Sequence, residues 1–190
     1  MLVYTHSEDN RRVLQEENKT QKYKLVVQPH LHAAYNLARW LMRDGRDAED
    51  VVQEACLRAF KFLDGFRGGD GRAWLLAIVR NTGYTWLQQN RAHVLNTVEF
   101  DEEIHSAEFD VANSEGIHHQ QIDEQMLRQA LEELPVEFRE MIVLRELEGF
   151  SYKEIAELAN IPLGTVMSRL ARARVRLQRH FTRVTKKGED

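Results

Sequence analysis

Six side chains near the C-terminal end of the sequence have the chemistry to bind nucleic acid. They are spaced four and three residues apart: Thr165, Arg169, Arg172, Arg176, Arg179 and Arg183. No acidic residue occurs between Thr165 and Lys187. Arginine can hold guanine O6 and N7 with two hydrogen bonds, a contact worth roughly 1–3 kcal/mol of base discrimination. The pattern predicts a DNA-contacting helix, and the alternative is a solvated basic helix on a helical bundle.

The residues around this stretch predict two helices that would present it. Ser151 and Glu154 have the spacing of a capping box, which begins a short helix that ends before Pro162. A second helix begins near Leu163, and its apolar stripe follows at Val166, Leu170, Ala173 and Leu177. A short capped helix, a turn and a basic amphipathic helix describe a helix-turn-helix, whose second helix enters the major groove. A solvated basic helix would explain neither the capped first helix nor the glycine of the second, Gly164.

A second charged group lies at the start of a helix expected over residues 48–63. Asp47 is expected to cap this helix, and Asp50, Gln53 and Glu54 share one polar face because they are three or four residues apart. Acidic residues in a first turn complement the helix dipole, which explains Asp47 better than Gln53 and Glu54. Like charges on one face also fit a basic partner, and the residues alone leave both interpretations open.

The N-terminal half of the sequence predicts a bundle of three amphipathic helices. Their expected ranges are 24–42, 48–63 and 72–89, and in the second helix Cys56 and Phe60 are among the residues expected to point inward. The glycine-rich segment 64–71 separates the second helix from the third. It lacks the residue order of a phosphate-binding P-loop, and no apolar strand precedes it. The residues alone therefore indicate a connector.

Composition narrows the class of protein. The chain has 190 residues, a net charge of −4 and one cysteine. A single cysteine excludes a disulfide framework and fits a reducing compartment. The polar N-terminus lacks the apolar core of a signal peptide, and no apolar run is long enough to cross a bilayer. We therefore expect a cytoplasmic protein.

Charge is distributed unevenly along the chain, which reconciles a negative total with DNA binding. Residues 92–127 contain no lysine or arginine and many acidic residues, whereas the C-terminal helix is basic. The expected fold class is all-α, with two small helical bundles joined by an acidic flexible linker and a helix-turn-helix in the C-terminal bundle. The expected divisions are a flexible leader at 1–22, a bundle at 23–91, the linker at 92–123, a bundle at 124–183 and a tail at 184–190.

The sequence lacks the signatures of an enzyme or a metalloprotein. It contains no Ser-His-Asp or Cys-His grouping and no carboxylate pair in a recognisable pocket signature. The adjacent His118 and His119 lack the helical or C-x-x-C spacing of a strong metal site. We expect no catalytic residue, no metal and no cofactor.

Two separate sets of motifs resemble bacterial RNA polymerase sigma factors of the extracytoplasmic-function (ECF) group. In the C-terminal half they are L-E-E-L-P-V-E-F-R-E-M-I-V-L-R-E-L at 131–147, S-Y-K-E-I-A at 151–156, I-P-L-G-T-V at 161–166 and S-R-L-A-R-A-R at 168–174. In the N-terminal half they are A-E-D-V-V-Q-E-A-C-L-R-A-F at 48–60 and F-R-G-G-D-G-R-A-W-L-L-A-I-V-R-N at 66–81. This chain departs from the family at Met167, where lysine or arginine is usual, and after Asn81, where fewer basic residues follow.

The resemblance implies a role for each motif. The acidic face would dock on a coiled coil of the polymerase β′ subunit through Asp47, Asp50, Gln53 and Glu54. The glycine-rich loop and the helix after it would contact an unpaired base of the −10-type promoter element through Gly68, Gly69, Asp70, Arg80, Asn81 and Tyr84. The helix-turn-helix would contact the −35-type element through Lys153, Pro162, Gly164, Thr165, Met167, Ser168, Arg169, Arg172, Arg174 and Arg176.

The implied function is to bind core RNA polymerase through its β′ and β subunits, direct it to promoter DNA and help open the duplex. The family also implies an anti-sigma factor as a partner, and we expect a monomer when the protein is free. The alternative is a stand-alone helix-turn-helix regulator whose N-terminal bundle is a sensor or dimerisation domain. That alternative predicts tight binding to a palindrome without polymerase.

Overall fold

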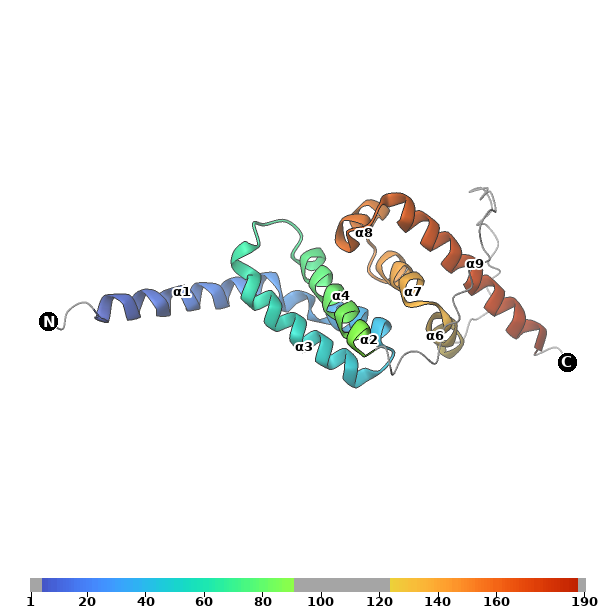
Figure 1. Ribbon diagram of the computed structural model, residues 1–190, viewed down its shortest axis with the longest axis horizontal. Helices are drawn as coiled ribbons and strands as arrows, with labels where there is room; N and C mark the ends of the chain where they lie inside the picture. Colours follow the sequence, from blue (N-terminus) through green and yellow to red (C-terminus); the bar gives the residue numbers. More distant parts are fainter. Residues whose placement is uncertain (1–4, 91–123, 188–190) are drawn as a thin grey trace.

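The computed structural model describes residues 5–90 and 124–187, with side chains at 15–90 and 125–183. All the regular elements in these ranges are helical (Figure 1). The first range contains α1 (Thr5–Val26), η1 (Gln28–His30), α2 (Leu31–Met42), α3 (Gly45–Phe62), η2 (Leu63–Gly65) and α4 (Gly71–Gln89). The second contains α6 (Glu124–Glu133), α7 (Val136–Ile142), the π-helical turn η3 (Val143–Leu147), α8 (Tyr152–Ala159) and α9 (Leu163–Lys187). The all-α fold with a C-terminal helix-turn-helix is confirmed, and the expected linker at 92–123 lies outside the described residues.

The N-terminal unit is built from α2, α3 and α4, which pack on one another. Each helix buries one apolar stripe, and the fully buried residues include Leu37, Val51 and Leu75. Gly83 allows α4 to approach α2 closely, because a Cβ at Gly83 would lie 3.2 Å from Met42 Cε and 3.3 Å from Leu41 Cδ1. The three helices expected from periodicity are therefore present and form one bundle.

Several helix ends differ from those expected. The N-cap of α3 is Asp44 and not Asp47, since the Asp44 carboxylate accepts hydrogen bonds from the backbone N–H groups of Arg46 and Asp47. These two bonds lower the pKa of Asp44. The helix expected over 24–42 is interrupted by the 3₁₀ turn η1, of which Pro29 is the second residue. Phe60 does not point inward as expected and is 40% exposed.

The expectation of a flexible leader at 1–22 is wrong for the part of it that belongs to α1. This helix continues from Thr5 to Val26 and forms one end of the molecule in Figure 1. Its last turns pack on η2, where Lys19 and Lys22 make polar contacts and Tyr23 packs edge-on against Phe60 at 5.6 Å. These partners lie far away in sequence, which is why the local composition did not predict them.

The C-terminal unit comprises α6 to α9. Pro135 is the N-cap of α7. After η3 the chain reverses at Gly149, which has a φ of 73°, a conformation that glycine adopts without strain. The helix α9 continues into the expected tail, to Lys187.

The two units pack against each other. In Figure 1, α4 lies beside α7 and α8, and buried apolar residues from both units form one continuous cluster. The contact surfaces are α2 and α4 on one side and α7, η3 and α8 on the other. Candidate site residues on the contacting faces of these helices are therefore covered by the other unit.

Candidate nucleic-acid and polymerase interfaces

The turn of the helix-turn-helix has the local geometry that its sequence predicts. The Ser151 hydroxyl accepts a hydrogen bond from the Glu154 N–H at 3.3 Å, and the Glu154 carboxylate accepts one from the Ser151 N–H at 2.7 Å. These bonds lower the pKa of Glu154. Asn160 ends α8 in the left-handed conformation, at φ 52° and ψ 50°. The Pro162 carbonyl then accepts from the Thr165 N–H at 2.9 Å, which begins α9.

The helix α9 buries one stripe and exposes the opposite one. Val166, Leu170 and Ala173 are at most 1% exposed. The start of the helix is open, with Pro162, Gly164, Met167 and Ser168 exposed and Thr165 half-buried. A Cβ at Gly164 would have no neighbour within 4 Å among the described residues. Gly164 therefore does not serve internal packing, and the surface beside it is free for an external partner.

The arginines expected to contact DNA differ in how far they are committed to contacts within the chain. Arg172 is exposed, and so is Lys153 on α8. Arg174 pairs with Glu146 at 2.9 Å and also donates to the Tyr152 hydroxyl at 3.3 Å. The Arg176 guanidinium lies over the Phe138 ring, 5.3 Å from its centre. Arg169 is half-buried, and its positive charge is close enough to Glu140 to favour the ionised form of that carboxyl.

The acidic face of α3 is open at three of its four expected residues. Asp50, Gln53 and Glu54 are exposed, whereas Asp47 is half-buried. Glu54 accepts a hydrogen bond from Arg58 at 2.7 Å, a surface ion pair four residues along the helix. The face thus keeps the charges that a basic partner would meet.

An apolar surface that the sequence reasoning missed continues the acidic face of α3. A shallow hollow beside Gln53 is lined by Tyr23, Cys56, Leu57 and Phe60, and Leu57 is 68% exposed. Leu57 could have indicated this surface from the sequence, because it is an apolar residue that lies off the buried stripe of α3. Acidic and apolar residues side by side are typical of a protein-binding surface.

The glycine-rich loop between η2 and α4 is exposed from Arg67 to Asp70. Gly68 and Gly69 both have a φ of 98°, which side chains rarely adopt, and a Cβ at either would meet nothing within 4 Å in the described structure. Asp70 caps α4 by accepting a hydrogen bond from the Arg72 N–H at 2.8 Å. The loop is open to an external partner along its whole length.

Two of the α4 residues expected to contact DNA are instead bound to the C-terminal unit. Glu140 of α7 is 0% exposed and accepts hydrogen bonds from Arg80 Nε and from the Tyr84 hydroxyl, the latter at 2.8 Å. Burial raises the pKa of Glu140, and Arg80 and Tyr84 oppose that rise. Burial, together with the charge of Glu140, also raises the pKa of Tyr84. Asn81, the next residue on α4, is exposed.

Further arginines join the two units around this contact. The Arg139 side chain is 2% exposed and donates to the Leu41 carbonyl at 3.4 Å. Burial and the nearby Arg43 lower the pKa of Arg139 to about 10, so it stays charged at neutral pH. At the other end of α4, Arg72 pairs with the Glu148 carboxylate and donates to the Glu148 carbonyl at 2.7 Å. The sequence reasoning missed these residues, because charged side chains in a helix usually indicate a solvated face.

Residues 5–90 and 124–187 contain neither a candidate metal site nor a candidate membrane-spanning helix. No group of three or more His, Cys, Asp or Glu side chains there is arranged to hold a metal ion. Within the same ranges, none of the helices combines the length and apolar character needed to cross a membrane.

Comparison with known proteins gives two family matches that divide the chain as its fold does. The family described as "Sigma-70 region 2" matches residues 26–93, and the family described as "Sigma-70, region 4" matches residues 124–177. The ECF RNA polymerase sigma-E factor of Escherichia coli (strain K12) is 36% identical over 158 residues, which cover 80% of this chain and 82% of that protein. The ECF RNA polymerase sigma factor SigE of Mycolicibacterium smegmatis is 32% identical over 158 residues, which cover 83% and 61% respectively.

Two solved structures with a similar fold are complexes of two proteins. The sigma factor RpoE from Bartonella quintana, in complex with the anti-sigma factor NepR, matches with a TM-score of 0.63 and 29% identity, covering 87% of this chain and 98% of that one. CnrH in complex with the cytosolic domain of CnrY matches with a TM-score of 0.59 and 25% identity, covering 90% and 96%.

Proposed function

This chain belongs to the ECF group of RNA polymerase sigma factors, and we propose that it binds core RNA polymerase and directs it to promoters through two separate DNA-contacting surfaces. The observation that carries the proposal is the open start of α9: the helix buries Val166 and Leu170 and exposes Gly164, Met167 and Ser168. The regulator alternative is not favoured, because both units match sigma regions in their order along the chain.

The helix-turn-helix is proposed to bind the −35-type element as double-stranded DNA. The exposed N-terminal end of α9 would face phosphate, and Arg172 would contact a base edge. The Ser168 hydroxyl donates to the Thr165 carbonyl at 3.1 Å, so it could donate to phosphate only after it leaves that carbonyl. Lys153, which is exposed on α8, would contact the DNA backbone. Arg174 and Arg176 must first leave their partners within the chain, so we propose a smaller contribution from each.

The acidic face of α3 is proposed to dock on the polymerase, on a basic coiled coil of the β′ subunit. Asp50, Gln53 and Glu54 would supply the charged contacts, and the adjacent Leu57 would supply apolar area. Interfaces of this kind combine an apolar centre with a polar rim. The β subunit is proposed as a further contact of the chain within the assembled polymerase.

The loop from Arg67 to Asp70 is proposed to receive an unpaired base of the −10-type element. Its glycines leave room for a base to approach the backbone, and Asn81 on α4 is exposed to hydrogen-bond a base edge. Arg80 and Tyr84 could join this contact only after they release Glu140. Contact of all the proposed α4 residues with the promoter therefore requires that the two units separate.

An anti-sigma factor is proposed as a regulatory partner. The support is that one solved structure with a similar fold is the sigma factor RpoE in complex with the anti-sigma factor NepR, and another is CnrH in complex with the cytosolic domain of CnrY. The free protein is proposed to be a cytoplasmic monomer. Its action consists of binding, and the chemistry of RNA synthesis belongs to the polymerase.

The test is reconstitution of the full-length chain with core RNA polymerase, followed by transcription from a library of promoters. We expect transcription from a specific subset of promoters. An Asp50→Lys/Glu54→Lys double variant should lose polymerase binding in a pull-down and keep its helicity and melting temperature, because both side chains are exposed. A Glu16→Lys/Glu17→Lys double variant, which reverses two exposed acidic charges on α1, is the matched control. Normal polymerase binding by the folded double variant would remove the docking assignment.

A further inference from the structure

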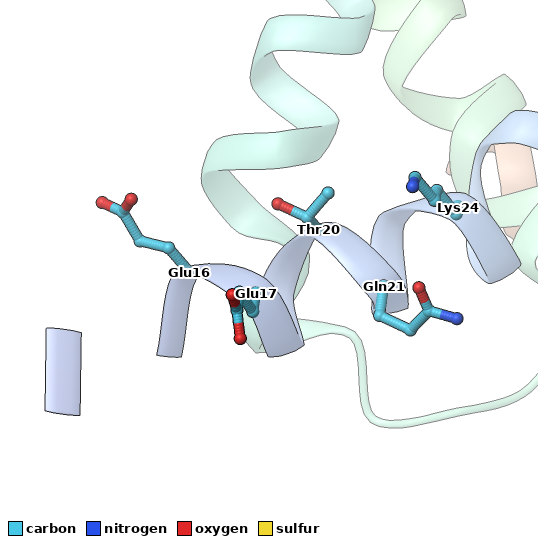
Figure 2. A pocket seen from close by; sticks show the side chains of 5 residues that line it. All are labelled: Glu16, Glu17, Thr20, Gln21 and Lys24. Atoms are coloured by element: carbon cyan, nitrogen blue, oxygen red, sulfur yellow. The ribbon is translucent and has the colours of Figure 1, made fainter. Parts of the chain in front are cut away.

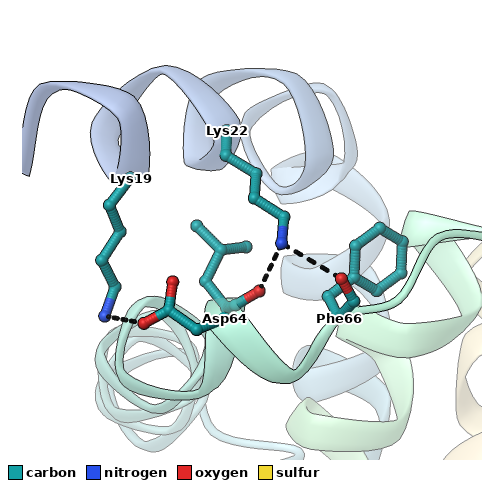
Figure 3. Close-up of polar contacts among 5 residues, drawn as sticks. Lys19, Lys22, Asp64 and Phe66 are labelled. Carbon is teal, nitrogen blue, oxygen red and sulfur yellow. Dashed lines mark hydrogen bonds and ion pairs between the residues drawn. The ribbon is translucent and has the colours of Figure 1, made fainter. Parts of the chain in front are cut away.

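The helix α1 contacts the segment from which the promoter loop starts. Lys22 Nζ donates two hydrogen bonds to backbone carbonyls, to that of Leu63 at 2.9 Å and to that of Phe66 at 3.1 Å (Figure 3). Both carbonyls lie just before the exposed loop Arg67–Asp70. Hydrogen bonds from a charged donor are stronger than neutral ones, so Lys22 fixes the backbone at the N-terminal end of the loop.

Two further contacts support the same end of the loop. Lys19 Nζ pairs with the Asp64 carboxylate at 3.1 Å, which ties η2 to α1 a second time (Figure 3). The ring of Phe66 packs on Trp74 of α4 with the ring centres 5.1 Å apart, and the Lys22 ammonium lies 5.9 Å from the Phe66 ring. The residue before the loop is thus held between α1 and α4.

The C-terminal end of the loop also lies against α1. A Cβ at Gly71, the first residue of α4, would lie 2.8 Å from the Val26 carbonyl oxygen and 3.1 Å from Val26 Cγ1. Only a glycine fits so close to the last turn of α1. The same helix therefore contacts both ends of the loop, through Lys22 and Val26.

Between these ends the loop has little support of its own. Gly68 and Gly69 have no neighbour in the described structure that a Cβ would touch, and residues 67–70 are all exposed. A short glycine-containing segment samples many conformations unless its ends are fixed. The shape that the loop offers to a partner consequently depends on how its ends are held.

We propose that α1 is the positioning element of the promoter loop, and that Lys22 is a positioning residue for recognition of the unpaired −10-type base. The inference rests on the proposed function, in which residues 67–70 contact that base. The region 2 family match begins at residue 26, so Lys22 lies outside the matched segment. Lys22 acts through the Leu63 and Phe66 carbonyls and not by touching DNA.

The test uses holoenzyme assembled from core polymerase and the full-length chain. The probe is a short fluorescent single strand that carries the −10 element of a promoter selected from a random library by the wild-type holoenzyme. The selectivity is the ratio of its affinity to that of the same strand with one −10 base replaced. We expect Lys22→Met to reduce this selectivity about tenfold, since it removes both carbonyl contacts of a charged donor. Binding to core polymerase and the melting temperature of the chain should change little.

Lys24→Met is the matched control. Lys24 lies on the same helix and loses the same charge, but it is exposed on the outer face, beside a shallow hollow also lined by Glu16, Glu17, Thr20 and Gln21 (Figure 2). Lys24→Met should keep the wild-type selectivity. Lys22→Arg, which retains the charged donor, should restore most of what Lys22→Met loses. If Lys22→Met and Lys24→Met lose selectivity equally, the effect is general electrostatics and the inference is overturned.

Two more variants separate failure of the inference from failure of the proposed function. Gly71→Ala tests the second end of the loop and should also lower selectivity, because its methyl group would displace Val26. Asp70→Ser tests the loop itself, since serine still caps α4 but removes the carboxylate. Wild-type selectivity in Lys22→Met and Gly71→Ala with a loss in Asp70→Ser would overturn the positioning role alone. Wild-type selectivity in all three would overturn the loop assignment and the inference with it.

Discussion

The two surfaces proposed to contact promoter DNA differ in what covers them within the chain. On α9 the proposed contacts Gly164, Met167 and Ser168 lie opposite the buried stripe and are exposed. On α4 the proposed contacts Arg80 and Tyr84 lie on the face that packs against α7, where both bind Glu140. The proposed contacts on α9 named above are exposed, and those on α4 are occupied by a contact within the chain.

If Arg80 and Tyr84 contact DNA as proposed, one buried carboxylate links DNA binding to the arrangement of the units. Glu140 satisfies an arginine and a tyrosine that would otherwise be available to nucleic acid. In the described structure the exposed Gly164, Met167 and Ser168 at the start of α9 have no such link, whereas the half-buried Arg169 lies close enough to Glu140 to interact with its charge. Three predictions test this contrast, in order of decreasing effect.

The largest effect is expected from Glu140→Lys, which places a second cation against Arg80 in a buried contact. Breaking a buried ion pair costs about 3–5 kcal/mol, so the two units should separate. Small-angle scattering should show a larger radius of gyration for the free protein, and circular dichroism should show retained helicity. The free variant should also bind the −10 single strand more tightly than the wild type does.

Glu157→Lys provides the control for this change, because Glu157 is exposed on α8. It should leave the radius of gyration unchanged. If a folded Glu140→Lys protein stays as compact as the wild type, the contact with Arg80 and Tyr84 does not hold the units together.

An intermediate effect is expected on the open surface. Arg172→Ala should weaken binding of holoenzyme to the upstream promoter element by roughly 1–3 kcal/mol if Arg172 contacts a base. Arg174→Ala should cost less, because Arg174 is already paired with Glu146 and Tyr152. Fluorescence anisotropy with duplex DNA of the selected promoter would measure both. Equal losses for the two variants on every DNA sequence would show that α9 acts through general electrostatics alone.

The smallest effect is expected from pH. Burial raises the pKa of Glu140 in the docked form, so the docked form holds a proton more tightly than the separated form. Docking should therefore be strongest below the ordinary glutamate value of 4.5 and should weaken as pH rises through the raised value. For one titrating group, the free energy of docking changes by at most about 1.4 kcal/mol per pH unit.

Other titratable or charged groups lie near Glu140 and could also contribute to a pH response. Arg80, Tyr84 and Arg169 act on Glu140 directly, and Glu137 acts on Tyr84. Scattering at a series of pH values would follow the equilibrium, with Glu140→Gln as the variant that cannot titrate at this position. A pH response that is the same in Glu140→Gln would assign the effect to another group.

Local patterns predicted those parts of the fold that depend on neighbours in sequence. The capping box at Ser151, the turn at Asn160 and the buried stripe of α9 each involve residues a few positions apart, and all three are present. The prediction of Asp47 as the N-cap of α3 was wrong by three residues, because Asp44 and Asp47 are both acidic and lie close together. Both can cap a helix, and only the backbone geometry shows that Asp44 does.

Contacts between distant residues could not be predicted in this way. Lys22 appeared to be one charge in a polar leader, because its partners Leu63 and Phe66 come more than 40 residues later. The burial of Arg139 and Glu140 was not predicted, since nothing near them in sequence indicates that α2 and α4 cover them. Charged residues are buried only where partners exist, and those partners were contributed by the other unit.

The contact between Glu140 and Arg80 has a consequence for measured affinities. If the −10 strand needs Arg80, only molecules with separated units bind it fully, so the apparent affinity is the intrinsic one multiplied by the separated fraction. Any ligand that favours separated units then increases DNA affinity without touching DNA, and by linkage DNA increases the affinity for that ligand by the same factor. An activating effect of core polymerase on −10 binding would therefore not prove that polymerase contacts the strand. The carboxylate of Glu140 would compete with DNA from within the chain, at a strength that no dilution of the protein can reduce.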